Sequence, residues 1–267
     1  MVGPRSGSLG RPPFVLLAPA ALAAALLVVP LLTLVLDTPW HDFFSQLTST
    51  PVLQALWLTA LASVATVIAC LLLGTPLAWL LARIDFSGRG LLRAAVTVPL
   101  VLPPVVAGVA LITALGRTGV IGQPLDEWFG VTIPYTTTAV VIAHTFVSLP
   151  FYVLSVEGAL RSSGEDLDVV AATLGADRWT TFRRVTLPLA MPGILAGCAL
   201  AWARSLGEFG ATITFAGNYP GVTQTMPSLI YTELQSDPQV ARTLSMVLLA
   251  VSLGVLALLR NRWLTRP

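Results

Sequence analysis

Long apolar runs separated by short polar segments dominate this chain. The runs lie at 14–36, 55–81, 91–115, 136–156, 188–206 and 243–259. A helix needs about 20 apolar residues to cross the hydrocarbon core of a bilayer, and the runs are close to or above that length. They lack the alternation of apolar and polar residues that is typical of a barrel strand. The pattern therefore predicts an all-α integral membrane protein with six transmembrane helices.

The composition agrees with a membrane environment. Hydrophobic residues make up 55% of the chain and charged residues only 10%, whereas soluble domains carry about 25% charged residues. The net charge of +2 is too small and too scattered to indicate nucleic-acid binding. Cys70 and Cys198 each lie inside an apolar run, which argues against a disulfide framework.

The basic residues, all of them arginine, are distributed asymmetrically between the two sides of the predicted bundle. One side has only Arg117 and Arg242, and Arg204 lies near the end of the fifth run. The other side holds Arg5, Arg11, Arg83, Arg89, Arg93, Arg161, Arg178, Arg183, Arg184, Arg260, Arg262 and Arg266. Because basic residues are enriched in cytoplasmic loops, we expect both termini and the 157–187 loop to lie in the cytoplasm.

These boundaries divide the chain into four parts. We expect a disordered cytoplasmic tail rich in Gly, Pro and Ser at 1–13, a first transmembrane helix with its outer loop at 14–54, a membrane domain at 55–260, and a cytoplasmic tail at 261–267. The run at 14–36 is too long for the apolar core of a signal peptide, and no convincing cleavage site follows it, so we interpret it as an anchor.

The sequence contains no signature of catalysis, metal binding or nucleotide binding. It has no lysine, so it cannot contain the phosphate-binding pattern G-x-x-x-x-G-K-[ST]. No metal-ligand cluster is visible, and we expect His144 to form a hydrogen bond between helices. We therefore assign no catalytic residue and no cofactor to this chain.

Three prolines interrupt the third apolar run, at Pro99, Pro103 and Pro104. Proline removes a backbone donor and kinks a helix. Two interpretations stay open. The kink is tolerated among neighbouring helices, or the bent helix lines a transport pathway, with Pro103 and Pro104 as candidate pathway residues.

The polar segment at 168–188, DVVAATLGADRWTTFRRVTLP, separates two apolar runs. Residues 169–174 can form one short helix with an apolar face, Gly175 allows the chain to turn, and Asp177 can cap a second short helix. The turn glycine also implies tight packing, so Gly175→Asp is expected to impair assembly but not membrane insertion. Such a segment either enters a groove on a partner protein or lies on lipid headgroups.

The polar segment resembles the EAA loop of permease subunits in ABC importers. The matching positions are Ala171, Gly175, Phe182, Leu187 and Pro188. The family's glutamate falls at Val169 and its first alanine at Val170, while Asp168 lies one position earlier. The resemblance covers about 55–260.

That resemblance implies a fold, partners and a location. The fold is the six-helix permease fold of type I ABC importers. The loop forms a coupling helix that docks into a cleft on a cytoplasmic ATPase. The partners are a second copy of the chain, two ATP-binding cassette subunits that carry ATP and Mg, and an extracytoplasmic binding protein. The location is the bacterial inner membrane.

A second segment, ARSLGEFGATITF at 203–215, resembles permeases for tetrahedral oxyanions, and closely the molybdate subset. Arg204 and Glu208 are four residues apart, so they can pair on one helix face. This pair either orients helix ends or places Arg204 in the electrostatic environment of the anion, with Thr212 and Thr214 as hydroxyl donors. Gly210, like Gly207, permits close helix approach or local unwinding.

Other functions stay open at this point. Sulfate permeases share the Gly-Glu-aromatic-Gly core, and molybdate cannot be separated from tungstate by sequence. A secondary transporter would need a buried charge relay, for which the chain offers chiefly Arg204, Glu208 and Glu157. A membrane-embedded enzyme would need clustered catalytic side chains in the apolar runs, and none is visible.

Overall fold

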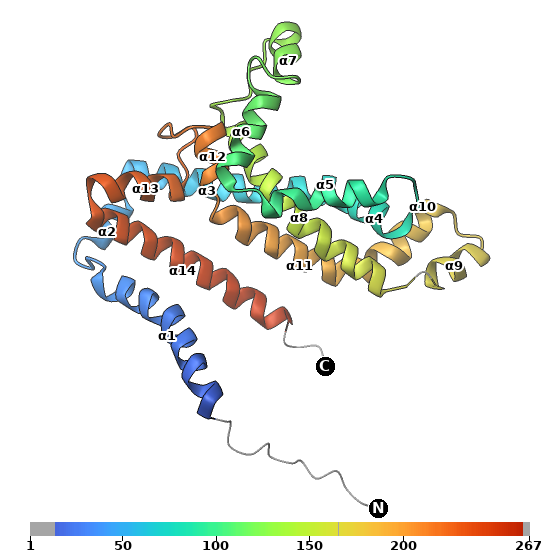
Figure 1. The fold of residues 1–267 in the computed structure, drawn as a ribbon, viewed down its shortest axis with the longest axis horizontal. Coiled ribbons are helices and arrows are strands. Elements are labelled where there is room, and N and C mark those ends of the chain that lie inside the picture. The colour runs from blue at the N-terminus through green and yellow to red at the C-terminus, as the bar shows by residue number, and fades with distance from the viewer. Residues whose placement is uncertain (1–13, 165, 264–267) are drawn as a thin grey trace, which may run out of the picture.

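The computed structural model describes residues 14–164 and 166–263, and every regular element within them is a helix (Figure 1). The predicted tail at 1–13 lies outside the described residues, as do the last four residues of the predicted tail at 261–267. The helices are α1 (Phe14–Asp37), α2 (Phe43–Leu47), α3 (Thr50–Ala69), the π-helical η1 (Cys70–Gly74), α4 (Thr75–Arg83), α5 (Arg89–Val101), α6 (Pro104–Leu115), α7 (Gly122–Phe129), α8 (Thr137–Ser162), α9 (Asp166–Thr173), α10 (Arg178–Thr181), the π-helical η2 (Phe182–Thr186), α11 (Leu187–Leu206), α12 (Gly210–Phe215), α13 (Met226–Ser236) and α14 (Pro238–Trp263).

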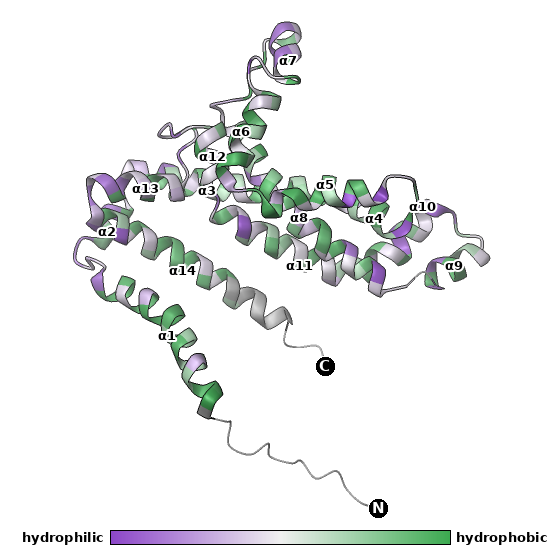
Figure 2. Cartoon of the chain, in the orientation of Figure 1, coloured by the Kyte–Doolittle hydropathy of each residue, from purple (hydrophilic) through white to green (hydrophobic). Residues whose placement is uncertain are grey.

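A bundle built around α8 forms the centre of the structure. α8 packs along α11, α3 and α4, and α12 packs on α6. Figure 2 shows hydrophobic residues along the long helices, and the α9–α10 end lies opposite the α2–α13 end (Figure 1). α1 lies beside α14, and none of the residues in its apolar window is buried inside the described structure. Its side chains therefore need lipid or another protein to cover them.

Five helical stretches are long and apolar enough to cross a membrane: Val15–Asp37, Thr50–Arg83, Thr137–Ser162, Arg178–Leu206 and Pro238–Val255. They correspond to five of the predicted runs. The remaining predicted span at 91–115 is not confirmed, because this run consists of two helices of 13 and 12 residues, α5 and α6, rather than one long helix.

The break between α5 and α6 has a local cause. A residue that precedes proline is disfavoured in the helical region and moves to extended backbone angles. Leu102 precedes Pro103, and Pro103 precedes Pro104, so both residues are extended, with ψ of 131° and 136°. Pro99 is tolerated inside α5. The result is a corner at which α6 turns away from the bundle axis (Figure 1).

Two π-helical turns keep the long helices continuous across other prolines. η1 directly precedes α4, whose second residue is Pro76, and η2 directly precedes α11, whose second residue is Pro188. Proline cannot donate a backbone hydrogen bond, and its ring clashes with the carbonyl four residues earlier. In both cases that carbonyl belongs to the π turn, whose wider winding accommodates the ring.

Candidate functional site

The polar segment forms two short helices, α9 and α10, at one end of the bundle (Figure 1). α9 ends in a left-handed turn at Gly175, where φ is +85°. The Gly175 amide donates to the Ala172 carbonyl at 3.0 Å, and the Ala176 amide donates to the Ala171 carbonyl at 3.0 Å. This arrangement is a glycine C-cap, as the sequence predicts.

The second predicted cap is also present. The Asp177 carboxylate accepts a hydrogen bond from the Thr180 amide at 3.0 Å and so begins α10. Hydrogen bonds from the side chain and the backbone of Thr180 hold the pKa of the Asp177 carboxyl below its usual value. The two caps fix the direction in which the chain leaves α9 and enters α10.

The expected tight packing at Gly175 is wrong within this chain, because a Cβ atom there would meet nothing within 4 Å. Glycine is required by the backbone conformation instead. We expect Gly175→Ala to destabilise the turn locally by about 1–2 kcal/mol, the cost of a left-handed L-residue. Limited trypsin digestion should then cleave faster at Arg178.

Gly158 provides the matched control for this variant, because it is open on α8 and its φ is not positive. We expect Gly158→Ala to leave the trypsin cleavage rate at Arg178 unchanged. Equal cleavage rates in the wild type and in Gly175→Ala would show that the turn does not depend on glycine.

α9 presents two different faces. Leu167, Val170 and Leu174 recur at helical spacing, and their side chains are 50%, 51% and 83% exposed. The opposite face carries Asp168 and Ala172, which line a cavity between α9 and the bundle. The predicted apolar face is therefore exposed at Val170 and Leu174, while Ala171 is half-buried and Val169, although 60% exposed, borders the cavity. Leu167, Val170 and Leu174 thus form an exposed apolar stripe.

Phe182 joins the second half of the polar segment to the bundle. Its ring stacks on Trp179 with centroids 5.8 Å apart and meets the edge of Trp79 at 6.1 Å. Leu187 packs against the core formed by α4, α8 and α11. The exposed Pro188 follows in the first turn of α11. The aromatic contacts and Leu187 therefore anchor α10 and η2 to α4 and α11.

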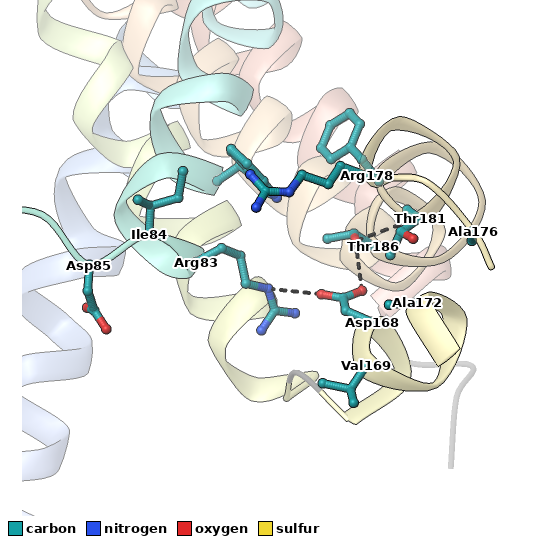
Figure 3. A pocket seen from close by; sticks show the side chains of 12 residues that line it. Arg83, Ile84, Asp85, Asp168, Val169, Ala172, Ala176, Arg178, Thr181 and Thr186 are labelled. Carbon is teal, nitrogen blue, oxygen red and sulfur yellow. Dashed lines mark hydrogen bonds and ion pairs between the residues drawn. The ribbon is translucent and has the colours of Figure 1, made fainter. Parts of the chain in front are cut away.

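Asp168 lies in the cavity between α9 and the bundle, which has a volume of about 500 Å³ (Figure 3). Its Oδ1 accepts a hydrogen bond from the Thr186 hydroxyl at 2.9 Å, and its Oδ2 lies 3.5 Å from Nε of Arg83. The sequence did not indicate these partners. Arg83 follows the second apolar run, and its position there indicates only the orientation of the helix.

Arg204 and Glu208 form the predicted ion pair at 2.8 Å, and Glu208 is 1% exposed. The other carboxylate oxygen of Glu208 accepts from the Ala211 amide at 2.8 Å. Glu208 therefore ties the end of α11 to the start of α12 across the unwound residues 207–209. This geometry agrees with the interpretation of the pair as one that orients helix ends.

The remaining pathway candidates lie where α6 meets α12. Pro103 and Pro104 are exposed at the start of α6. A Cβ on Gly210 would stand 2.6 Å from that of Pro104, so glycine permits this close contact. The Thr214 hydroxyl donates to the Gly210 carbonyl at 2.8 Å, and Thr212 is fully buried. The structure brings Pro104 and Thr214 to the same helix pair, and their place on a pathway stays a prediction.

Two further buried polar groups, His144 and Glu157, have partners within the protein. Nδ1 of His144 lies 2.7 Å from the Ser205 hydroxyl on α11, which confirms the predicted contact between helices. Glu157 is buried and forms ion pairs with Arg93 on α5 and Arg161 on α8. No group of His, Cys, Asp and Glu that could hold a metal ion occurs among residues 14–164 and 166–263.

A family profile described as "Binding-protein-dependent transport system inner membrane component" matches residues 74–266. The chain belongs to this family. It is therefore a multi-pass membrane component of a transport system. The polar segment at 168–188 and the ion pairs of Glu157 and Glu208 are features of such a component. Two curated relatives and one solved structure illustrate the similarity.

The chain is 47% identical over 234 residues to the molybdenum transport system permease protein ModB of Mycobacterium tuberculosis, with 88% of each chain covered. It is 37% identical over 235 residues to the sulfate transport system permease protein CysT of Salmonella typhimurium, with 86% of this chain and 84% of that protein covered. In fold it resembles a chain from the crystal structure of a bacterial ABC transporter that imports alginate, with a TM-score of 0.71, 20% identity, and coverage of 95% and 96%.

Proposed function

We propose that this chain is the permease subunit of an ATP-driven importer for molybdate in the bacterial inner membrane. The observation that carries the proposal is the 47% identity, over 88% of both chains, to a permease named for molybdenum transport. Identity to a permease named for sulfate transport is lower, at 37%. Sulfate transport is the alternative, and tungstate is a second substrate of the same charge and shape.

The transporter requires partner proteins that bind ATP and deliver the substrate. Two copies of the chain form one pathway at their interface. Two ATP-binding cassette subunits bind ATP and Mg in the cytoplasm, and an extracytoplasmic binding protein delivers the oxyanion. The exposed apolar stripe of α9 supports an ATPase partner, because an amphipathic helix binds a protein groove through its apolar face. Both termini and the polar segment lie on the cytoplasmic side.

The import cycle follows from this arrangement. ATP binding draws the two ATPase subunits together, and α9 of each permease copy moves with its ATPase. The bundles rock between inward-facing and outward-facing states, and ATP energy shifts the populations of these states. Arg204 contributes positive charge near the pathway, Thr212 and Thr214 provide hydroxyl groups, and the corner at Pro103 and Pro104 shapes its wall. Weak contacts of this kind allow the anion to leave.

A secondary transporter that needs no ATPase is the other alternative. Such a transporter requires titratable groups free to change partners across the membrane. Glu157 and Glu208 are instead each held by arginine, Glu157 by Arg93 and Arg161 and Glu208 by Arg204. These pairs favour fixed structural roles.

Competition during uptake tests the substrate. Vesicles with the complete transporter and its binding protein should take up labelled molybdate when ATP is supplied inside. We expect excess unlabelled molybdate or tungstate to abolish the uptake of labelled molybdate. Sulfate at a concentration equal to that of the labelled molybdate should reduce this uptake by less than about twofold, because a site whose polar groups are arranged for one anion discriminates against another. Equal competition by sulfate would favour the sulfate assignment.

A further inference from the structure

We propose that Asp168 is a positioning residue that fastens α9 to the bundle, and that α9 meets its partner through the apolar stripe alone. The proposal rests on the proposed function for its partner, the ATPase. It does not depend on that function for the contacts inside this chain. Asp168 stands one position before the site where the EAA pattern has glutamate, and the pattern's position is occupied by Val169.

The two faces of α9 are the first argument. An α9 that used Asp168 to bind a partner would expose this carboxylate on its outer face. Instead the exposed large side chains here are all apolar, namely Leu167, Val169, Val170 and Leu174, while the Asp168 side chain is 24% exposed and faces the cavity (Figure 3). The distribution is the reverse of that on a surface helix, which buries its apolar face against its own protein.

The contacts of Asp168 are the second argument. Thr186 belongs to η2, which continues into α11, and Arg83 is the last residue of α4. Arg83 also donates to the hydroxyl of Ser163 at the end of α8, at 3.2 Å. The Arg83 side chain is 8% exposed. One carboxylate thus connects α9 to the ends of α4 and α11 and, through Arg83, to the end of α8.

The packing of α9 is the third argument, because it gives no substantial contact with α4. The helices that pack substantially on α9 are the short elements α10 and η2, and a cavity of about 500 Å³ separates its inner face from the end of α4. Within the described residues, the polar contacts of α9 to the bundle are those of Asp168. A force applied to α9 therefore reaches α4 through the ion pair, and it reaches α11 through the hydrogen bond to Thr186 together with the packing on η2.

Hydrogen exchange on the purified full-length chain tests the fastening without any partner. We expect the α9 amides to exchange on the order of tenfold faster in Asp168→Ala, because a hydrogen bond to a charged group contributes about that factor. Asp168→Asn, which keeps the oxygen that accepts from Thr186 but loses the charge, should give a smaller increase. Thr186→Val, which removes the donor, should also speed exchange.

Asp166→Asn is the matched control, because Asp166 is an exposed carboxylate in the same first turn of α9. It should leave α9 exchange unchanged. The double variant Arg83→Asp with Asp168→Arg swaps the two charges. Its α9 amides should exchange more slowly than those of either single variant. Unchanged exchange in Asp168→Ala would overturn the proposal, as would an equal increase in Asp166→Asn.

The reconstituted transporter tests the consequence for transport. We expect Asp168→Asn to retain the ATPase as well as the wild type does, but to hydrolyse severalfold more ATP per oxyanion imported, because movement of α9 is transmitted less completely. Loss of the ATPase in Asp168→Asn, or an unchanged ratio, would overturn this role. A wild-type chain that retains no ATPase would refute the proposed function. Hydrogen exchange on the isolated chain would still show whether Asp168 fastens α9 to the bundle.

Discussion

Replacing Arg204 by alanine lowers the stability of the solubilised protein by about 3 kcal/mol or more, because the carboxylate of Glu208 is left buried without its cation. Glu208 is 1% exposed, so its carboxylate depends on the Arg204 guanidinium for its counter-charge. The Ala211 amide remains as a hydrogen-bond donor but does not neutralise the charge. Thermal unfolding of the purified chain in one detergent measures the loss.

The double variant Arg204→Ala with Glu208→Gln separates structure from transport. A glutamine at position 208 removes the buried charge and keeps an oxygen that can accept from Ala211, so we expect most of the lost stability to return. Oxyanion uptake should stay low if Arg204 attracts the substrate. Full recovery of uptake together with stability would leave the pair with a structural role only.

Replacing Leu174 by aspartate should abolish association with the ATPase. Leu174 is 83% exposed at the end of the apolar stripe, and a carboxylate buried in an apolar groove is costly to desolvate. We expect at least about a tenfold loss of affinity, which corresponds to 1.4 kcal/mol. Co-purification of the tagged chain with its ATPase measures this loss, and membrane insertion should be normal.

Leu234→Asp is the control for this variant. Leu234 is 59% exposed on α13, at the end of the bundle opposite to α9 (Figure 1). It makes the same substitution, with the same added charge, at another exposed leucine. Equal ATPase retention in the Leu174 and Leu234 variants would mean that the apolar stripe is not the docking surface.

Local rules predicted the local features of the site. A glycine after an apolar helical segment indicated the C-cap at Gly175, and Asp177 before a short helix indicated the N-cap. The spacing of Arg204 and Glu208 predicted their ion pair. Each of these features involves residues no more than five positions apart, so local helical geometry is sufficient to predict them.

Features that depend on tertiary packing were missed. The contact between Arg83 and Asp168 joins the ends of different helices, and nothing in either segment identifies the other. The corner at Leu102 has a local cause, but apolar periodicity does not reveal it, because residues on both sides of the corner are apolar. The two consecutive prolines are the local signal of this break, since each restricts the residue before it. Prolines in an apolar run also fit a kink within one span, which is what the sequence predicts.

Photo-crosslinking from position 174 tests most directly whether a partner ATPase engages α9. A photoreactive amino acid replaces Leu174 in cells that express the complete transporter, and the same residue at position 234 serves as the control. We expect an adduct between the chain and the ATPase subunit from position 174, and no such adduct from position 234. Adducts with lipid alone from position 174, or labelling of that position by a membrane-impermeant reagent added outside the cell, would contradict the assignment of this chain to an ATP-driven importer.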